Sequence, residues 1–209
     1  MTSDPIRSPA AVRAVRRLAA GAALLGTAAC ATGGGASGGG TEAASSVPVV
    51  AITRSMLLPT DPARAFAFIA AEDVLPKVLT GYGPLPAVVR TSDHTGPWDV
   101  PGSARIVHLA DGSTVREQVT LVDAPGRFAY RVWDFGHPVI AALATQGRGD
   151  WTFTAVDGGT RVDWTYAFDA KGTAASVPLR ALVAVLWRGY MDTCLENARR
   201  ALADGAKGA

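Results

Sequence analysis

The chain has 209 residues with a formal net charge of +2, and 48% of them are hydrophobic. Four of its 20 basic and one of its 18 acidic residues lie within residues 1–29, which leaves 16 basic against 17 acidic residues in the remainder. This near-neutral remainder, which lacks a basic stripe interleaved with aromatics, gives no reason to expect nucleic-acid binding. About 160 residues follow position 47, enough for one domain that buries roughly two thirds of its unfolded surface.

The N-terminal segment has the pattern of an export signal. Basic residues at 7, 13, 16 and 17 precede an uncharged run over 18–29, as in a secretory signal peptide. Residues 25–30 resemble a bacterial lipobox, although Thr27 stands where an aliphatic residue is usual. We therefore expect a signal peptide at 1–29, acylation of Cys30, and an exported lipoprotein anchored to the outer face of the cell membrane.

Two other fates of this segment are open. An ordinary signal peptide would give a secreted or periplasmic protein. An uncleaved anchor is disfavoured because the apolar run has only 12 residues, whereas a spanning helix needs about 20. The pair Arg16-Arg17 also leaves twin-arginine export open beside the general pathway.

The residues after Cys30 are typical of a flexible tether. Six glycines and a single charge, Glu42, fall between positions 31 and 46, so this stretch cannot bury enough apolar surface to fold. With Cys30 acylated, Cys194 is the only other thiol, and no intramolecular disulfide is available. We expect a tether over 30–47, one domain over 48–204, and a disordered tail over 205–209.

The domain begins with a strand and two short helices. Residues 49–57 are rich in β-branched side chains, as in a strand. Thr60 or Asp61 then offers an N-cap ahead of Pro62, which predicts a helix to Ala70. A second short helix is expected over 72–79.

From there to residue 169 the hydrophobic period is two, which predicts antiparallel strands joined by turns. Residues 162–168 alternate large apolar with small or polar side chains, and 151–154 do the same across Gly158-Gly159, so the two should form a hairpin. After Ser176, a plausible N-cap, apolar residues recur at helical spacing to position 202, with Cys194 in their stripe. This predicts a long amphipathic C-terminal helix that packs by one face.

This order of elements resembles the helix-grip architecture of the START-like, Bet v 1-like superfamily. Within it, the chain is similar to bacterial members of the polyketide cyclase/dehydrase and lipid-transport family over roughly residues 48–204. The resemblance rests on segments 101–105, 109–112, 116–119, 128–131 and 158–164. It implies an α+β fold, in which a curved antiparallel sheet wraps around the last helix, and a cavity between them for a small apolar or amphipathic ligand.

Glu117 is the first candidate for contact with such a ligand. Strand alternation places it in one row with Val115, Val119 and Leu121. A carboxylate in an apolar row needs a partner. A three-residue loop over 111–113 would set Arg105 diagonal to the acid on the same face, whereas a two-residue loop over 111–112 would turn Arg105 outward and His108 inward.

Aromatic and histidine side chains supply the other candidates. Tyr130, Trp164 and Tyr166 lie in inward rows, where they can wall a cavity or serve only as core. Trp98 lies in a Gly- and Pro-rich loop where it would cap a pocket or hold the turn. The resemblance places His137 on a second cavity-side loop, with an exposed loop histidine as the alternative.

Several other kinds of site find no support. The histidines lack metal-ligand spacing, and neither a Gly-x-Ser-x-Gly elbow nor a phosphate-binding loop occurs. We expect no metal and no cofactor, and a monomer is favoured. The predicted function is that of a membrane-tethered extracytoplasmic protein that binds a small hydrophobic or amphipathic ligand, such as a lipid or a polyketide-like compound. The alternatives are a cyclase- or dehydratase-type enzyme with Glu117 as general acid or base, and a protein-interaction or stress-response module whose cavity is filled by its own side chains.

Overall fold

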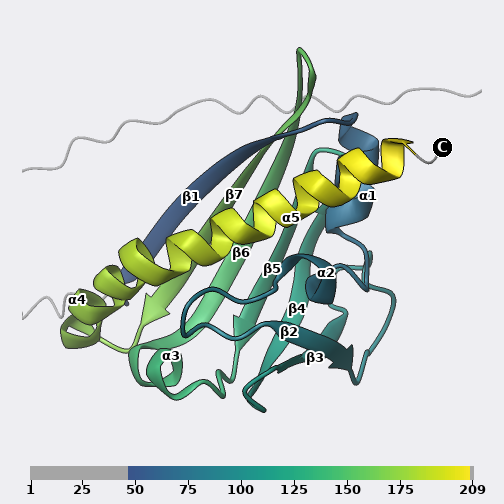
Figure 1. Ribbon diagram of the computed structural model, residues 1–209. Coiled ribbons are helices and arrows are strands. Elements are labelled where there is room, and N and C mark those ends of the chain that lie inside the picture. Colours follow the sequence, from purple (N-terminus) through teal and green to yellow (C-terminus); the bar gives the residue numbers. More distant parts are fainter. Residues whose placement is uncertain (1–46, 208–209) are drawn as a thin grey trace, which may run out of the picture. The chain divides into compact units, whose positions relative to one another are not determined.

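One curved sheet of seven antiparallel strands, crossed by a long C-terminal helix, makes up the domain (Figure 1). The computed structural model describes residues 47–207. The predicted signal peptide, Cys30 and nearly all of the tether therefore lie outside the described residues. The strands run β1-β7-β6-β5-β4-β3-β2 across the sheet. Their bounds are β1 Val49–Leu58, β2 Val88–Ser92, β3 Ala104–Leu109, β4 Thr114–Asp123, β5 Arg127–Trp133, β6 Ala144–Val156 and β7 Gly159–Ala170.

Two short helices follow β1, as the sequence predicts. Helix α1 spans Pro62–Ile69, and the side chain of its N-cap Asp61 accepts a hydrogen bond of 3.0 Å from the backbone N–H of Arg64. This cap satisfies a donor that the first turn leaves free. Helix α2, Leu75–Val78, is a single turn and is shorter than the helix expected over 72–79.

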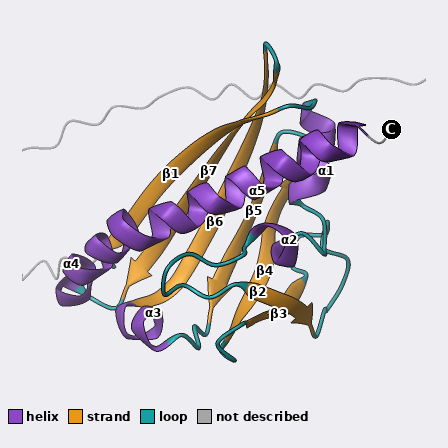
Figure 2. Ribbon diagram, viewed as in Figure 1, coloured by secondary structure: helices purple, strands orange, loops and turns teal. Residues whose placement is uncertain are grey.

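The strongest pairing in the sheet is the predicted hairpin of β6 and β7. Trp151 and Trp164 lie directly opposite each other, and their rings stack with centroids 4.4 Å apart. The turn needs Gly158 and Gly159, whose φ angles of 86° and 145° are unfavourable for other residues. Alternation places the large apolar residues of β7 on the buried face. The C-terminal helix crosses one face of the sheet (Figure 2).

A single extra residue in β4 changes which of the following side chains point to the core. A register shift between Val119 and Leu121 leaves Thr120 as an extra residue opposite β5, and such a bulge turns the following side chains to the other face. Val122 rather than Leu121 therefore packs against the core. The predicted row of Glu117 is correct up to Val119 and wrong for Leu121.

The C-terminal helix is continuous but not uniform. Helix α4 (Thr173–Leu182) leads into a π-helical turn at Val183–Trp187 and then into α5 (Arg188–Lys207). Gly172 is the N-cap. The prediction of Ser176 as N-cap is wrong, because this residue lies inside α4 and its hydroxyl donates to the Thr173 carbonyl at 2.8 Å.

The C-terminal end of the helix also differs from the expectation. Helix α5 continues to Lys207, so the prediction that a tail begins at residue 205 is wrong. No helix within residues 47–207 combines the length and the apolar character that crossing a membrane requires.

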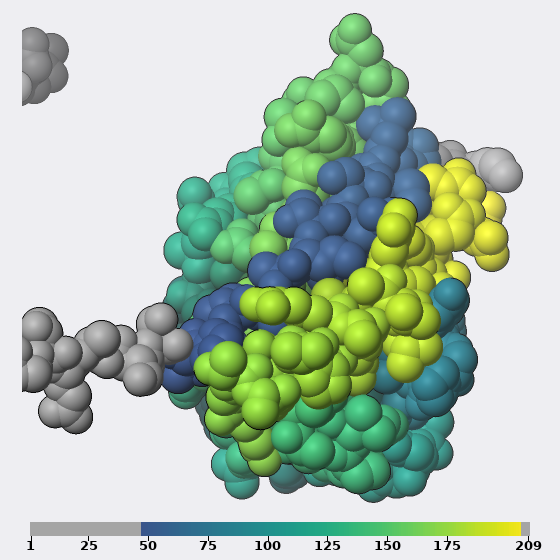
Figure 3. Space-filling model, turned by 90° about the vertical axis from the view of Figure 1, so that its left-hand side faces the viewer, coloured from purple at the N-terminus to yellow at the C-terminus, as the bar shows by residue number. Residues whose placement is uncertain are grey.

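One face of the helix is sealed against the sheet. Leu179, Met191, Leu195 and Ala198 are fully buried, and the Cys194 thiol is buried beside them. In the space-filling view the yellow-green helix lies against the blue β1 (Figure 3). The C-terminal helix and the sheet thus enclose the core between them.

Candidate functional site: a cavity between the sheet and the C-terminal helix

A largely apolar cavity of about 90 Å³ lies between the sheet and the C-terminal helix. A second space of about 30 Å³ shares Glu117, Tyr130 and Trp164 with it, together with two leucines of the α2 segment. The larger cavity exceeds the ~10–15 Å³ that a single water molecule needs. The interior is therefore not filled by its own side chains.

Glu117 and Arg105 form a buried ion pair at this cavity. They lie directly opposite each other on β4 and β3, and Nε and Nη2 of Arg105 both lie 2.8 Å from Oε2 of Glu117. Both predicted registers are wrong, because the loop spans residues 110–112, with the Leu109 N–H donating to the Ser113 carbonyl. Arg105 is the candidate partner under the three-residue loop, which places it on the correct face but diagonal to the acid.

Arg105 is fixed on its other sides as well. Its Nη1 donates to the Glu72 carbonyl at 2.7 Å, and its guanidinium lies 3.6 Å from the centroid of the Trp98 ring. Such a stacked contact holds a cation in place. Trp98, which is 3% exposed, thus lines the smaller cavity and supports Arg105.

The second carboxylate oxygen of Glu117 has a different environment. Only Oε2 is engaged by Arg105, and no hydrogen bond from residues 47–207 reaches Oε1. Glu117 lines both cavities. Burial raises the pKa of its carboxyl above the ordinary value, although the charge and hydrogen bonds of Arg105 oppose this.

The aromatic wall depends on two glycines of β6. The Tyr130 ring lies over Gly149, and the Tyr166 hydroxyl lies over Gly147, so that a Cβ at either position would collide with a tyrosine. Burial raises the pKa of both tyrosines well above the ordinary value, so they stay neutral. Sequence analysis found the tyrosines but missed these glycines, although glycine two apart within a strand signals a close approach.

Three further buried nitrogen atoms in the wall of the larger cavity have no partner. Nε1 of Trp164, Nε1 of Trp187 and Nδ1 of His137 form no hydrogen bond with any described residue. Trp187 ends the π-helical turn and is buried, although helical spacing did not predict it in the apolar stripe; its neighbour Leu186 is half-buried and also packs against the core. Leaving such groups unpaired costs free energy, and the three residues that carry them line the larger cavity.

The remaining candidates divide between the two faces of the sheet. His137 lines the larger cavity just before helix α3, Pro138–Leu143, a helix that the sequence analysis took for a loop. His108 lies on the opposite face of β3 from Arg105, where its Nε2 is 2.8 Å from the Ser92 hydroxyl. The prediction that His108 faces the cavity, open under one of the two registers, is therefore corrected.

The described part of the chain holds no group of three or more His, Cys, Asp or Glu side chains placed to bind a metal ion. Cys194 lines the smaller cavity, and burial raises the pKa of its thiol. The polar chemistry available in the larger cavity is therefore that of one carboxylate, phenol groups, indole N–H groups and an imidazole.

Known structures share this fold. The crystal structure of Ara h 8.0201 matches with a TM-score of 0.56 at 14% identity, covering 75% of this chain and 99% of that one. Norcoclaurine synthase from Thalictrum flavum, in complex with dopamine and hydroxybenzaldehyde, matches at 0.56 and 10%, covering 75% and 88%. The di-domain ARO/CYC StfQ from the steffimycin biosynthetic pathway matches at 0.57 and 18%, covering 77% and 53%. These likenesses show the fold alone.

Sequence comparison identifies the family. No curated protein sequence matches the chain. The family described as polyketide cyclase/dehydrase and lipid transport matches residues 49–203, nearly the whole of the domain described above. The chain therefore belongs to the polyketide cyclase/dehydrase and lipid transport family.

Proposed function

We propose that the protein is a membrane-tethered, extracytoplasmic binding protein for a small hydrophobic or amphipathic ligand held in the larger cavity. One observation carries this proposal: an apolar cavity is walled by a carboxylate with one free oxygen and by indole N–H groups without partners. Ligand sites are mostly apolar with a few placed polar groups. A cavity that served only for packing would be expected to have its polar groups paired.

The size of the cavity limits the ligand. A volume of about 90 Å³ is below the roughly 300 Å³ at which pockets for drug-sized ligands begin. The ligand is therefore small, or the α2 segment moves when a longer one enters. Asn197 of α5 holds this segment by donating to the Val78 carbonyl at 3.0 Å and to the Thr80 hydroxyl at 2.9 Å.

The tethering part of the proposal rests on the sequence of residues 1–46. Replacing Cys30 by Ala in the full chain tests it directly. We expect metabolic labelling with a radioactive fatty acid and membrane fractionation to show a labelled, membrane-bound wild type and an unlabelled variant in the soluble fraction. A wild type that takes up no label would exclude the lipid anchor while leaving the binding proposal in place.

Native mass spectrometry of the protein purified from its own host tests ligand binding. We expect a bound small molecule on the wild type and its loss from Glu117→Gln. Glu196→Gln, which changes a glutamate of α5 at the surface of the domain, should retain it. A wild type without any adduct that also fails to bind small apolar molecules in vitro would refute the proposal.

A second candidate function is favoured by a single observation, the raised pKa of Glu117. Such a carboxyl suits a general acid or base acting on a carbonyl or hydroxyl group. The same variant separates the two functions. An enzyme with Glu117→Gln should keep its ligand and lose turnover, whereas a carrier should lose affinity and show no turnover in either form.

A further inference from the structure

We infer that the ligand is a neutral, ring-sized molecule carrying a hydroxyl group, such as a phenol, and that the cavity discriminates against carboxylates and ammonium groups. This inference rests on the proposed function and names the chemical class that the same cavity accepts. Four features support it: the free oxygen of Glu117, the unpaired indole N–H groups, the pairing of Arg105 with Glu117, and the aromatic wall.

The free carboxylate oxygen calls for a donor on the ligand. Oε1 of Glu117 accepts no hydrogen bond from the described residues, and the side chain is only 6% exposed. Hydrogen bonds to charged acceptors are stronger than those between neutral groups. A ligand O–H aimed at Oε1 would supply the missing bond.

The indole groups call for an acceptor on the ligand. Nε1 of Trp164 and Nε1 of Trp187 are buried without partners, and these side chains are 2% and 9% exposed. The Trp187 ring packs on Tyr166 at 4.8 Å between centroids, and Trp164 lies 6.3 Å from the same ring. Both donors thus belong to the cluster that walls the cavity. A hydroxyl oxygen is donor and acceptor at once, so one group would serve the acid and, once a ring turns its N–H toward the cavity, an indole.

The charges of the site exclude ionic ligands. Arg105 directs Nε and Nη2 to Glu117 and Nη1 to the Glu72 carbonyl, so three of its five N–H groups are engaged and its charge is already balanced by Glu117. An anion would also face the Glu117 carboxylate across an apolar space, which is costly. An ammonium group would meet a carboxylate already neutralised by Arg105 and would leave the indole donors without an acceptor.

The shape of the site favours a flat ring. Tyr130, Tyr166 and Trp187 contribute aromatic faces to the wall, and offset or edge contacts between rings are favourable. A dry apolar cavity of roughly 150 Å³ is known to accept benzene. The two adjoining spaces here, of about 90 and 30 Å³, approach this volume.

Isothermal titration of the purified domain with phenol, toluene, benzoate and benzylammonium tests the inference. We expect phenol to bind about tenfold more tightly than its isostere toluene, as one hydrogen bond to a charged acceptor allows. Benzoate and benzylammonium should bind more weakly than toluene. If toluene equals phenol, or if either ion is preferred, the class inferred here is wrong while binding by the cavity stands. If none of the four binds, the inferred class is wrong, and the proposed function fails with it only if the protein from its own host also carries no adduct.

Two variants sharpen the test. Trp187→Phe keeps a ring but removes an indole donor, and it should lower the preference for phenol over toluene several-fold. Trp133→Phe is the matched control, because Trp133 lines neither cavity and lies beside Arg131. Glu117→Ala frees Arg105 and should convert the site to one that prefers benzoate over phenol. An unchanged preference in both site variants would overturn the inference.

Discussion

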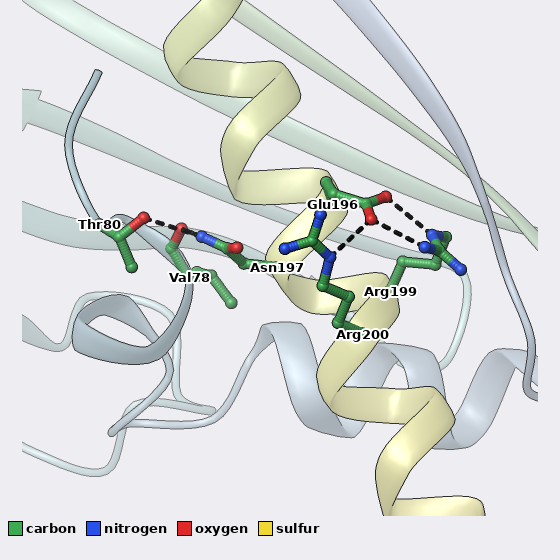
Figure 4. A network of polar contacts seen from close by, with 6 residues as sticks. All are labelled: Val78, Thr80, Glu196, Asn197, Arg199 and Arg200. Atoms are coloured by element: carbon green, nitrogen blue, oxygen red, sulfur yellow. Dashed lines mark hydrogen bonds and ion pairs between the residues drawn. The ribbon is translucent and has the colours of Figure 1, made fainter. Parts of the chain in front are cut away.

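Two arginine–glutamate clusters in this domain contain the same chemical groups in opposite surroundings. Glu196 on α5 accepts hydrogen bonds of 2.7–2.8 Å from Arg199 and Arg200 (Figure 4). These side chains are 30%, 41% and 66% exposed, whereas Arg105 and Glu117 are 1% and 6% exposed. The two arginines lower the pKa of Glu196 to about 2. Burial has the reverse effect on Glu117 and raises its pKa.

The difference shows that burial, and not the presence of arginine, decides whether the pKa of each glutamate is raised or lowered. On the helix surface the ionised form is solvated, and the pair adds little to folding. In the cavity wall the carboxylate is removed from water, and its desolvation is offset only in part by Arg105. A costly pair of this kind that also leaves one oxygen free is better explained by ligand binding than by stability.

The largest expected effect is on the free energy of unfolding when Arg105 is replaced by Met. Glu117 would then be buried without a partner, and the variant should lose about 3–5 kcal/mol in chemical denaturation. Arg200→Met, which removes a partner of the exposed cluster, should leave the denaturation midpoint unchanged. Adding Glu117→Leu to Arg105→Met should recover most of the loss. Equal effects at the two arginines would remove the distinction between the clusters.

A smaller loss of stability is expected when the close approach of the Tyr130 ring to Gly149 is blocked. Gly149→Ala forces a methyl group into the Tyr130 ring, and such overpacking costs about 1–3 kcal/mol. Gly126→Ala is the control, because a Cβ there would meet only the Asp123 carbonyl, at an ordinary 3.6 Å. Calorimetric melting of both variants measures the difference. A Gly149→Ala protein as stable as its control would show that the tyrosine wall is not closely packed.

The next largest effect is expected in the pH dependence of stability, which should distinguish Glu117 from Glu196. Because its folded pKa lies above the ordinary value of 4.5, the folded state retains a proton that the unfolded chain has released. The contribution of Glu117 is therefore present below pH 4.5 and is lost as pH rises through the folded pKa. The unfolding free energy of the wild type minus that of Glu117→Gln should fall as pH increases above 4.5. A difference that rises with pH would contradict the raised pKa.

The smallest effect is expected at Glu196, where the dependence of stability on pH should have the opposite sign. Its pKa is lowered to about 2, so its contribution is present above pH 4.5 and is lost as pH falls towards 2. Glu196→Gln should match the wild type in acid and be slightly less stable at neutral pH. Acid titration of both proteins, followed by circular dichroism, measures this. The same slope for the Glu117 and Glu196 variants would refute the comparison.

Much of this architecture could be predicted from the sequence because it follows local periodicity. Alternation predicted strand β7 and the inward position of Glu117, and the Asp61-Pro62 pair predicted the start of α1. The buried acid then required a partner, which pointed to Arg105 on physical grounds.

The errors arise where one residue changes the period or the register. The loop over 110–112 set the β3–β4 pairing, the extra residue Thr120 turned Leu121 away from the core, and the π-helical turn added Trp187 to the buried face. Each depends on tertiary packing that local patterns do not contain. Gly147 and Gly149 are different, because their spacing within a strand was visible in the sequence.

A crystal structure of the domain soaked with phenol tests the central claim most directly. We predict a phenol in the larger cavity with its oxygen about 2.5–3.0 Å from Oε1 of Glu117, while Arg105 stays on Oε2. A cavity closed by its own side chains, or a Glu117 with both oxygens held by Arg105 and no ligand beside it, would contradict the account.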